Sequence, residues 1–354
     1  MILFFYSAAS NTQVVRGSNI VRELNNTGNF TLEIYMYSRL MRLVVLSTEN
    51  RRLKKCLIVI QVFVNWALGW VKNICLKKQL MKAEIVVIPK RVGRKHLKIF
   101  QTWKIDRGGK VLYDLDDYIW SDSFREGEYF EDIINVADII TVDNEYLKHE
   151  IYNRYNVEAK VLMSYYNQKD YYLEPQKPSD IFKVGWLGSR TTFHYLRDIE
   201  NDLNQALEVA TFELHIAGIT REDAIISGSQ LLGDNVIYHG NYSASEMYRL
   251  LNSWHLGLFP IDNSKDGCGR GLLKVFLYLS TGCKVLSGRN INTIKFKEQY
   301  DCIVLENDHW KESVISFVQS YSSGNIPNKD HGVFLEQCTI SNYTQTLLRF
   351  LNTC

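Results

Sequence analysis

The chain has 354 residues, of which 46% are hydrophobic and 23% charged, and its formal net charge is +2. This composition is that of an ordinary globular protein, and it excludes a disordered, collagen-like or coiled-coil chain. Because a single hydrophobic core rarely grows beyond roughly 250 to 300 residues, the length predicts two domains. The seven cysteines form no C-x-x-C pair and the N-terminus has no signal-peptide pattern, so reduced thiols and a cytoplasmic location are expected.

Twelve short apolar runs alternate with helical stretches along the chain. They cover residues 1–7, 31–37, 83–89, 110–115, 137–142 and 158–163 in the first half, and 182–188, 211–218, 235–240, 255–260, 283–287 and 302–305 in the second. This alternation is typical of α/β proteins with parallel sheets, and it predicts two Rossmann-like domains. Residues 171–179 hold two of the five prolines, so we place the boundary there, between domains 1–170 and 171–338. Residues 341–351 predict a terminal helix.

The net charge conceals a strongly basic region. Residues 51–110 hold sixteen Lys or Arg and two acidic residues, a balance of +14, which leaves −12 for the rest of the chain. The apolar run 57–71 lies in this region and is shorter than the roughly 20 residues of a membrane span. We therefore expect peripheral docking of the N-terminal domain on an anionic membrane. A core helix beneath a basic surface is the alternative, and nucleic acid is not expected because the aromatic residues show no binding motif.

Open parallel sheets bind ligands at the carboxyl ends of their strands. Ser10, Asn11 and then Arg16 follow the first run, without the G-x-G-x-x-G pattern of dinucleotide binding. Asp114 lies near the end of the fourth run, and Asp116 and Asp117 follow it directly. Crowded carboxylates favour acid–base chemistry or metal binding. A helix-capping cluster and the D-x-D metal site of a single-domain nucleotide-sugar enzyme are the alternatives.

Two segments of the second half favour anion binding. Residues 184–192 predict a strand, a glycine turn at Gly188 and Ser189, and a helix, with Arg190 adding positive charge. Residues 262–274 predict a helix that carries Arg270 and Lys274 four residues apart, hence on one face. Ordinary surface charge is the alternative for this second pair.

Taken together, these segments resemble the GT-B glycosyltransferases, and in particular the family 4 group of retaining, nucleotide-sugar-dependent enzymes. The resemblance spans nearly the whole chain, and residues 113–117, 137–147, 185–192, 214–218 and 258–288 carry it. It implies two facing Rossmann-like domains, a donor held by the C-terminal one, and a last segment, 339–354, whose helix crosses back onto the first domain. No metal or other cofactor is expected.

The resemblance also implies roles for individual residues. Catalytic roles fall to Asp116, Lys274 and Arg190. The donor-binding residues are Gly188, Ser189, Arg190, Thr191, Gly218, His239, Gly240, Arg270 and Lys274, and the acceptor-side residues are Ser10, Asn11, Arg16, Asp117 and Glu145.

The implied function is transfer of a sugar from a nucleoside-diphosphate sugar to a glycan or lipid-linked acceptor hydroxyl. The anomeric configuration would be retained, in an EC 2.4 hexosyltransferase-like reaction of surface polysaccharide or glycoconjugate synthesis. One departure stands out: many family members carry two glutamates eight positions apart where this chain has Gly269 and Leu277. A non-catalytic subunit that binds nucleotide sugar or glycan is therefore the alternative.

Overall fold

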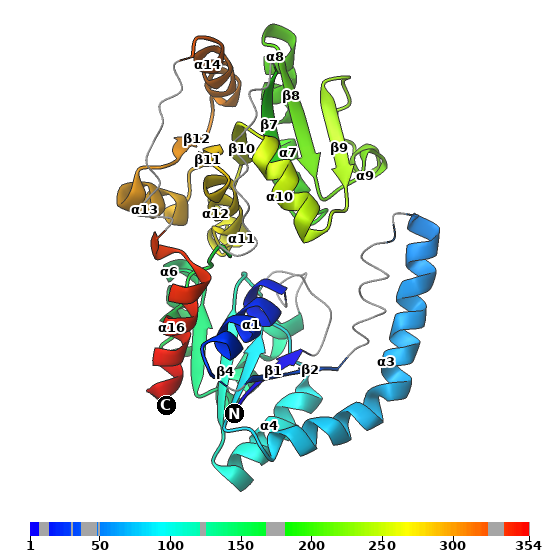
Figure 1. Cartoon of the computed structure of the whole chain (residues 1–354), viewed down its shortest axis with the longest axis vertical. Helices are drawn as coiled ribbons and strands as arrows, with labels where there is room; N and C mark the ends of the chain where they lie inside the picture. The colour runs from blue at the N-terminus through cyan, green and yellow to red at the C-terminus, as the bar shows by residue number, and fades with distance from the viewer. Residues whose placement is uncertain are drawn as a thin grey trace. The chain divides into compact units, whose positions relative to one another are not determined.

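The computed structural model describes residues 1–6, 14–29, 31–36, 48, 50–120, 125–167, 181–324 and 336–353. The chain divides into two compact units (Figure 1). The N-terminal unit comprises Met1–Ser164, Gly269–Gly271 and Ile340–Cys354, and the C-terminal unit comprises Tyr165–Cys268 and Leu272–Thr339. The predicted boundary at 171–179 lies outside the described residues.

The N-terminal unit contains a six-stranded sheet in the order β2-β1-β3-β4-β5-β6. All neighbouring strands run parallel. The strands are β1 (Ile2–Tyr6), β2 (Thr31–Tyr35), β3 (Ile85–Pro89), β4 (Lys110–Leu115), β5 (Ile139–Val142) and β6 (Lys160–Val161). The helices are a π-helical turn (Val14–Ser18), α1 (Asn19–Asn26), α3 (Arg51–Leu80), α4 (Arg94–Arg107), a 3-10 helix (Arg125–Tyr129), α5 (Phe130–Val136), α6 (Glu145–Tyr155) and α16 (Ile340–Asn352).

Local sequence explains several of these boundaries. Asn144 caps α6 by accepting a hydrogen bond from the backbone N–H of Leu147, as expected of an N-cap asparagine. Gly108 ends α4 in the left-handed conformation, with φ of 65°, which a glycine adopts without strain. The central strands are apolar and buried on both faces, as the parallel sheet requires.

The terminal helix α16 belongs to the N-terminal unit, although it is the last element of the chain. It packs against α1, and Ser341 Oγ on α16 donates a hydrogen bond of 3.0 Å to Glu23 Oε1. Near its other end, Lys160 Nζ lies 2.8 Å from Thr353 Oγ1. The helix that crosses back, an expectation drawn from the resemblance, is thus present.

The C-terminal unit contains a second six-stranded parallel sheet, in the order β12-β11-β10-β7-β8-β9. Its strands are β7 (Phe182–Leu187), β8 (Phe212–Ala217), β9 (Val236–Gly240), β10 (Leu256–Phe259), β11 (Lys284–Gly288) and β12 (Val304–Glu306). Its helices are α7 (Phe193–Asp198), α8 (Glu200–Val209), α9 (Arg221–Ile226), α10 (Ala244–Ser253), α11 (Lys265–Cys268), α12 (Leu273–Ser280), α13 (Ile291–Tyr300) and α14 (Trp310–Ser322).

The predicted fold class is confirmed: each unit is a Rossmann-like α/β domain, and each of the twelve strands overlaps one of the predicted apolar runs. In the second sheet the chain starts at β7, builds outward to β9, and then returns to the other side of β7 with β10. Such a reversal of strand order is where open α/β sheets bind ligands. The carboxyl end of β7 is therefore the place to examine for a site.

The alternative interpretation of the 57–71 run as a core helix is wrong. This run lies within α3, where Ile58, Val59, Ile60, Val62 and Phe63 are all exposed. Among the α3 side chains that the structure describes, the buried ones are Leu76 and Leu80, in the last turns of the helix. Among the residues that the structure describes, no helix is both long enough and apolar enough to cross a membrane.

Candidate functional site

Three glycines predicted on the donor side lie at the carboxyl ends of neighbouring strands. The backbone N–H of Gly188, after β7, donates to Ala217 O at 2.9 Å, and that of Gly218, after β8, donates to Gly240 O at 2.8 Å. Gly218 has φ of 100°, and a Cβ there would lie 2.0 Å from Gly188 O. The close approach therefore requires glycine at this position, and it leaves backbone rather than side chain at the strand ends.

A cluster of hydroxyl groups follows Gly188. Ser189 Oγ lies 2.9 Å from Thr191 Oγ1, and the backbone N–H of Ser189 donates to Thr192 Oγ1 at 3.1 Å. Lys274, in the first turn of α12, reaches this cluster: its Nζ lies 3.4 Å from Thr192 Oγ1 and 5.3 Å from the centre of the Trp186 ring. The structure thus brings together two segments predicted separately, 82 residues apart, into one cationic, donor-rich turn.

Arg190 lies at the edge of this turn. Its side chain is 59% exposed, and Nη1 lies 3.4 Å from Asp223 Oδ1 on α9. An exposed pair of this kind stabilises the fold by about 1 kcal/mol at most. The guanidinium is therefore held lightly and remains accessible to an anion.

The prediction that Arg270 and Lys274 share one face of a helix is wrong. Helix α12 begins at Leu273, and Arg270 lies in the turn between α11 and α12. Gly269 and Gly271 flank it, and glycine is a poor helix former because of its backbone freedom. The segment Gly269–Gly271 groups with the N-terminal unit, where Arg270 Nη1 lies 3.6 Å from Asp117 Oδ1.

In the N-terminal unit, Asp116 and Asp117 follow β4 and share one cation. Lys90 Nζ lies 3.3 Å from Asp116 Oδ1 and forms a close ion pair with Asp117. These two carboxylates raise the pKa of Lys90 against the lowering effect of its burial, so the ammonium stays charged. Among the described residues, no group of three or more His, Cys, Asp or Glu is arranged to hold a metal ion.

Arg16, predicted on the acceptor side, is buried with 2% of its surface exposed. Its Nη1 donates to both oxygens of Asp114, at 2.9 and 3.0 Å, and its Nη2 forms a close ion pair with Asp143. Nη2 also donates to Leu162 O, and Ser164 Oγ donates to Asp143 Oδ1. We call Arg16, Asp114 and Asp143 the buried ion triad.

Asp143 is a residue that the sequence analysis missed. Asp143 directly follows β5, and Asp114 is the last residue but one of β4. Because β4 and β5 pair directly, both carboxylates lie at one edge of the sheet. An acidic residue just after a predicted strand was the available signal. Of the remaining acceptor-side predictions, Glu145 opens α6 and lies 3.9 Å from Lys148 Nζ, whereas Ser10 and Asn11 fall outside the described residues.

A chain of three side chains leads to His239 across β8 and β9. His215 Nε2 lies 3.0 Å from Glu213 Oε2, and His215 Nδ1 lies 2.9 Å from His239 Nε2. Because a carboxylate only accepts, the neutral His215 ring donates from Nε2 and accepts at Nδ1. His239 therefore donates from Nε2, which leaves its Nδ1 as a hydrogen-bond acceptor.

Burial keeps several histidines neutral. Burial first, and nearby cations such as Lys183 beside His255 second, lower the pKa of His96, His239 and His255 to about 4. In the unfolded chain a histidine titrates near pH 6.5. The stability that these neutral rings contribute is therefore fully present above about pH 6.5, and it is lost as the pH falls toward 4.

We accordingly expect the melting temperature to fall between pH 7.5 and pH 5.0 at constant ionic strength. The free energy of unfolding should fall by about 1 kcal/mol per histidine, after allowance for solvent screening. His255 Nδ1 accepts the backbone N–H of Lys183 at 2.9 Å, and an asparagine oxygen can replace that acceptor. His255→Asn should therefore reduce the difference between the two melting temperatures. An unchanged difference in this variant would contradict the assignment.

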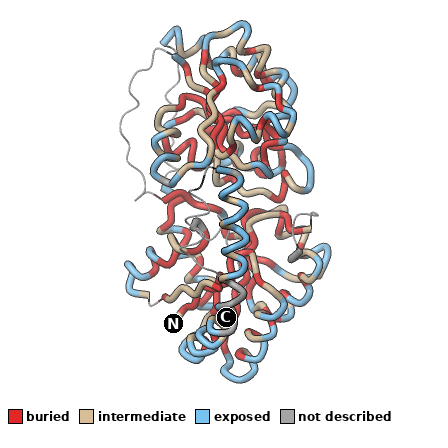
Figure 2. Tube along the Cα trace, turned by 90° about the vertical axis from the view of Figure 1, so that its right-hand side faces the viewer, coloured by how far each residue is buried: buried red, intermediate tan, exposed pale blue. Residues whose placement is uncertain are grey.

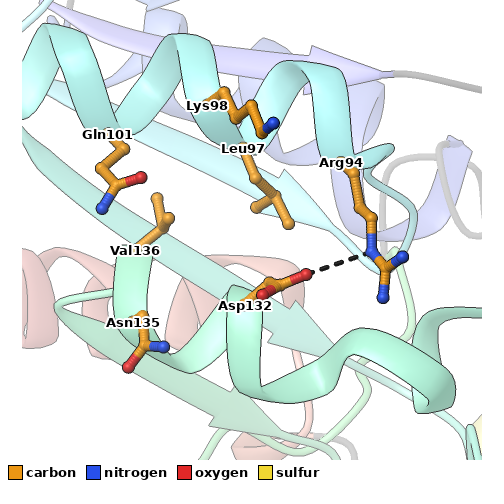
Figure 3. A pocket seen from close by; sticks show the side chains of 7 residues that line it. All are labelled: Arg94, Leu97, Lys98, Gln101, Asp132, Asn135 and Val136. Atoms are coloured by element: carbon orange, nitrogen blue, oxygen red, sulfur yellow. Dashed lines mark hydrogen bonds and ion pairs between the residues drawn. The ribbon is translucent and has the colours of Figure 1, made fainter.

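A surface hollow on the N-terminal unit lies between α4 and α5 (Figure 3). Its lining residues are Arg94, Leu97, Lys98, Gln101, Asp132, Asn135 and Val136. Arg94 Nε and Asp132 Oδ2 form an exposed ion pair of 3.1 Å across it. The predicted site residues are not among those that line this hollow, so it plays no part in the site.

Comparison with known proteins identifies the fold. No protein-family model matches the chain, and no similar sequence is found among curated proteins. Among solved structures, HepE from Anabaena in complex with UDP and glucose is similar over 100% of this chain and 99% of its own, with a TM-score of 0.67 and 11% identity. A glycosyltransferase from Rickettsia africae gives 0.68 at 13% identity, over 99% of this chain and 97% of its own.

The lipopolysaccharide outer core galactosyltransferase WaaB is also similar, with a TM-score of 0.57 and 14% identity over 99% of both chains. These neighbours are GT-B glycosyltransferases, each matched over almost its whole length. Likeness at this level of identity defines the architecture: the chain has the GT-B fold, as the resemblance in its sequence implied.

Proposed function

We propose that this protein transfers a sugar from a nucleoside-diphosphate sugar to a hydroxyl of a glycan or lipid-linked acceptor, with retention of the anomeric configuration. The observation that carries the proposal is the turn after β7, where Lys274 contacts Thr192 Oγ1, which also accepts the backbone N–H of Ser189. This turn lies at the switch point of the sheet, where such folds bind ligands. Its ammonium group, hydroxyl groups and N–H groups can bind the oxygens of a diphosphate.

The proposed chemistry follows from the charge that develops when the sugar leaves. The leaving diphosphate oxygens gain negative charge, and groups already positioned to receive it lower the barrier. Lys274 supplies a cation that the Trp186 ring and Thr192 hold in place, and Arg190 supplies a second, accessible one. Ser189, Thr191 and the N–H groups of the turn donate hydrogen bonds.

His239 has a proposed role in recognising the base. Its Nδ1 is an acceptor because the chain from Glu213 orients both histidine rings. An acceptor at the end of β9 suits an N–H donor on the base, such as the imide of uracil. The UDP and UDP-glucose complexes of HepE support a uridine donor as the first candidate.

In the N-terminal unit, we assign Asp116 to orienting the acceptor or a sugar hydroxyl, with Asp117 and Glu145 on the acceptor side. Lys90 and Arg270 already neutralise Asp116 and Asp117, which supports a metal-independent reaction in which these carboxylates hold no catalytic ion. The net charge of +14 over residues 51–110 supports a membrane-carried acceptor, as in surface polysaccharide or glycoconjugate synthesis at the inner membrane face.

This function predicts that UDP or a UDP-sugar protects the protein against thermal unfolding in buffer that contains a chelator. A ligand at about 100 times its Kd stabilises a protein by about 2.7 kcal/mol. Inorganic phosphate at the same concentration is the control and should protect much less.

We also expect transfer or slow donor hydrolysis to persist in chelator. Failure of every nucleoside diphosphate and its sugars to protect would refute donor binding, and activity that requires manganese would refute metal independence.

A further inference from the structure

Much of helix α3 is exposed to solvent (Figure 2), and many of its exposed side chains are large and apolar. Val59 and Phe63, one turn apart, are 68% and 65% exposed. The exposed large apolar residues of α3 are Leu53, Ile58, Val59, Ile60, Val62, Phe63, Leu68, Val71 and Ile74. Soluble surfaces rarely leave so many apolar side chains together in water, and such a surface marks a contact with a protein or a membrane.

The charges of α3 are confined to its two ends and are all positive. The helix holds seven Lys or Arg and no Asp or Glu. Residues 56–71 carry no charge, and these sixteen residues extend about 24 Å at 1.5 Å per residue. Arg52 and Lys55 lie exposed before this stretch, and Lys77 and Lys78 lie exposed after it. The pattern is an uncharged middle between two basic ends.

The C-terminal end of α3 packs in the core of the N-terminal unit, whereas the apolar side chains named above are exposed. Leu76 and Leu80 are buried in the core, and Trp103 Nε1 on α4 donates a hydrogen bond of 2.7 Å to Leu80 O. The helix begins at an asparagine cap, with Asn50 accepting from the N–H groups of Arg52 and Leu53. The exposed stretch is thus part of a capped helix whose C-terminal end packs in the core.

Charge decides between the two occupants that an apolar helix face can have. A second copy would pair this face with itself around a two-fold axis, which brings basic ends against basic ends with no acidic partner on α3. An anionic bilayer offers both an apolar layer for the middle and phosphates for the ends. Sixteen uncharged residues are too few to span the bilayer, so the helix would lie along its surface.

We infer that α3 is a membrane-surface helix, whose uncharged middle enters the boundary between headgroups and acyl chains of an anionic bilayer while its basic ends bind lipid phosphates. The link to a lipid-linked acceptor rests on the proposed function. Membrane binding itself does not, since it requires neither donor nor turnover.

Flotation of the full chain with vesicles of phosphatidylcholine, with and without phosphatidylglycerol, tests the inference. We expect stronger binding to the anionic vesicles. Val59→Ser combined with Phe63→Ser should lower binding to both vesicle types at least about tenfold, because it removes apolar surface. Arg52→Gln combined with Lys55→Gln should lower binding to the anionic vesicles alone about 30-fold, from about 1 kcal/mol per basic residue.

Val209→Ser combined with Ile225→Ser is the matched control, because these apolar residues are also more than half exposed but lie on α8 and α9. This variant should bind like the unmodified chain, and all variants should keep its melting temperature because the changes are on the surface. Absence of vesicle binding, or binding that the α3 variants leave unchanged, would overturn the inference. So would a dimer that the Val59 and Phe63 changes dissociate in a protein that binds no vesicles. A protein that floats but binds no nucleotide would refute the proposed function alone.

Discussion

Lys274→Ala is expected to lower turnover by about 10²- to 10³-fold, the typical effect of losing one preorganised group that stabilises charge in the transition state. The Lys274 ammonium lies against Thr192 Oγ1 and the Trp186 ring, so its position is set before any donor arrives. Lys274 is half-buried, and the substitution removes its cation–π contact with Trp186 but no buried apolar side chain, so the fold should stay intact. Steady-state transfer or donor hydrolysis, together with a melting curve, measures both effects.

Two variants make this result specific. Lys274→Arg keeps a positive charge and should recover part of the activity, whereas Lys295→Ala removes an exposed lysine from α13 and should leave turnover unchanged. Full activity in Lys274→Ala would refute the assigned role.

If the unmodified protein binds nucleotide sugars but neither transfers nor hydrolyses them with any candidate acceptor, the alternative of a non-catalytic binding subunit is correct. Gly269 and Leu277 motivate that alternative, because they stand where the resemblance in the sequence leads one to expect a glutamate pair.

The second large effect is expected on stability. Arg16→Met should lower the free energy of unfolding by about 3 to 5 kcal/mol, because Asp114 and Asp143 would remain buried without their cation. Whole domains are stable by only about 5 to 15 kcal/mol, so the N-terminal unit would lose a large part of its stability. Chemical denaturation followed by circular dichroism measures the change.

Arg94→Met is the matched control for the buried ion triad. Arg94 pairs with Asp132 across the surface hollow, and both side chains are more than half exposed. Loss of an exposed pair is expected to change stability by about 1 kcal/mol or less. Adding Asp143→Asn to Arg16→Met should recover part of the loss, since it removes one of the stranded charges. Equal effects of Arg16→Met and Arg94→Met would show that the triad does not stabilise the fold.

The sequence by itself determined the architecture. Short β-branched and apolar runs separated by helical stretches can bury both faces only in parallel sheets, which is why all twelve strands overlap predicted runs. The glycine turn after β7 was also predictable, because Gly188, Gly218 and Gly240 each mark a strand end in the linear sequence. These signals are local: each depends on residues within a few positions of one another.

Only the tertiary structure decided which charges meet and which surfaces stay exposed. Arg16 binds Asp114 and Asp143 across 98 and 127 residues, and Lys274 reaches Thr192 across 82, distances over which no sequence period carries information. The four-residue spacing of Arg270 and Lys274 led to a wrong prediction of a shared helix face, because Gly269 and Gly271 precede the helix, which begins only at Leu273. From the sequence, the apolar run of α3 was equally consistent with a core helix. Hydrophobic residues indicate that burial of a segment would be favourable, but not whether the fold provides a surface that buries it.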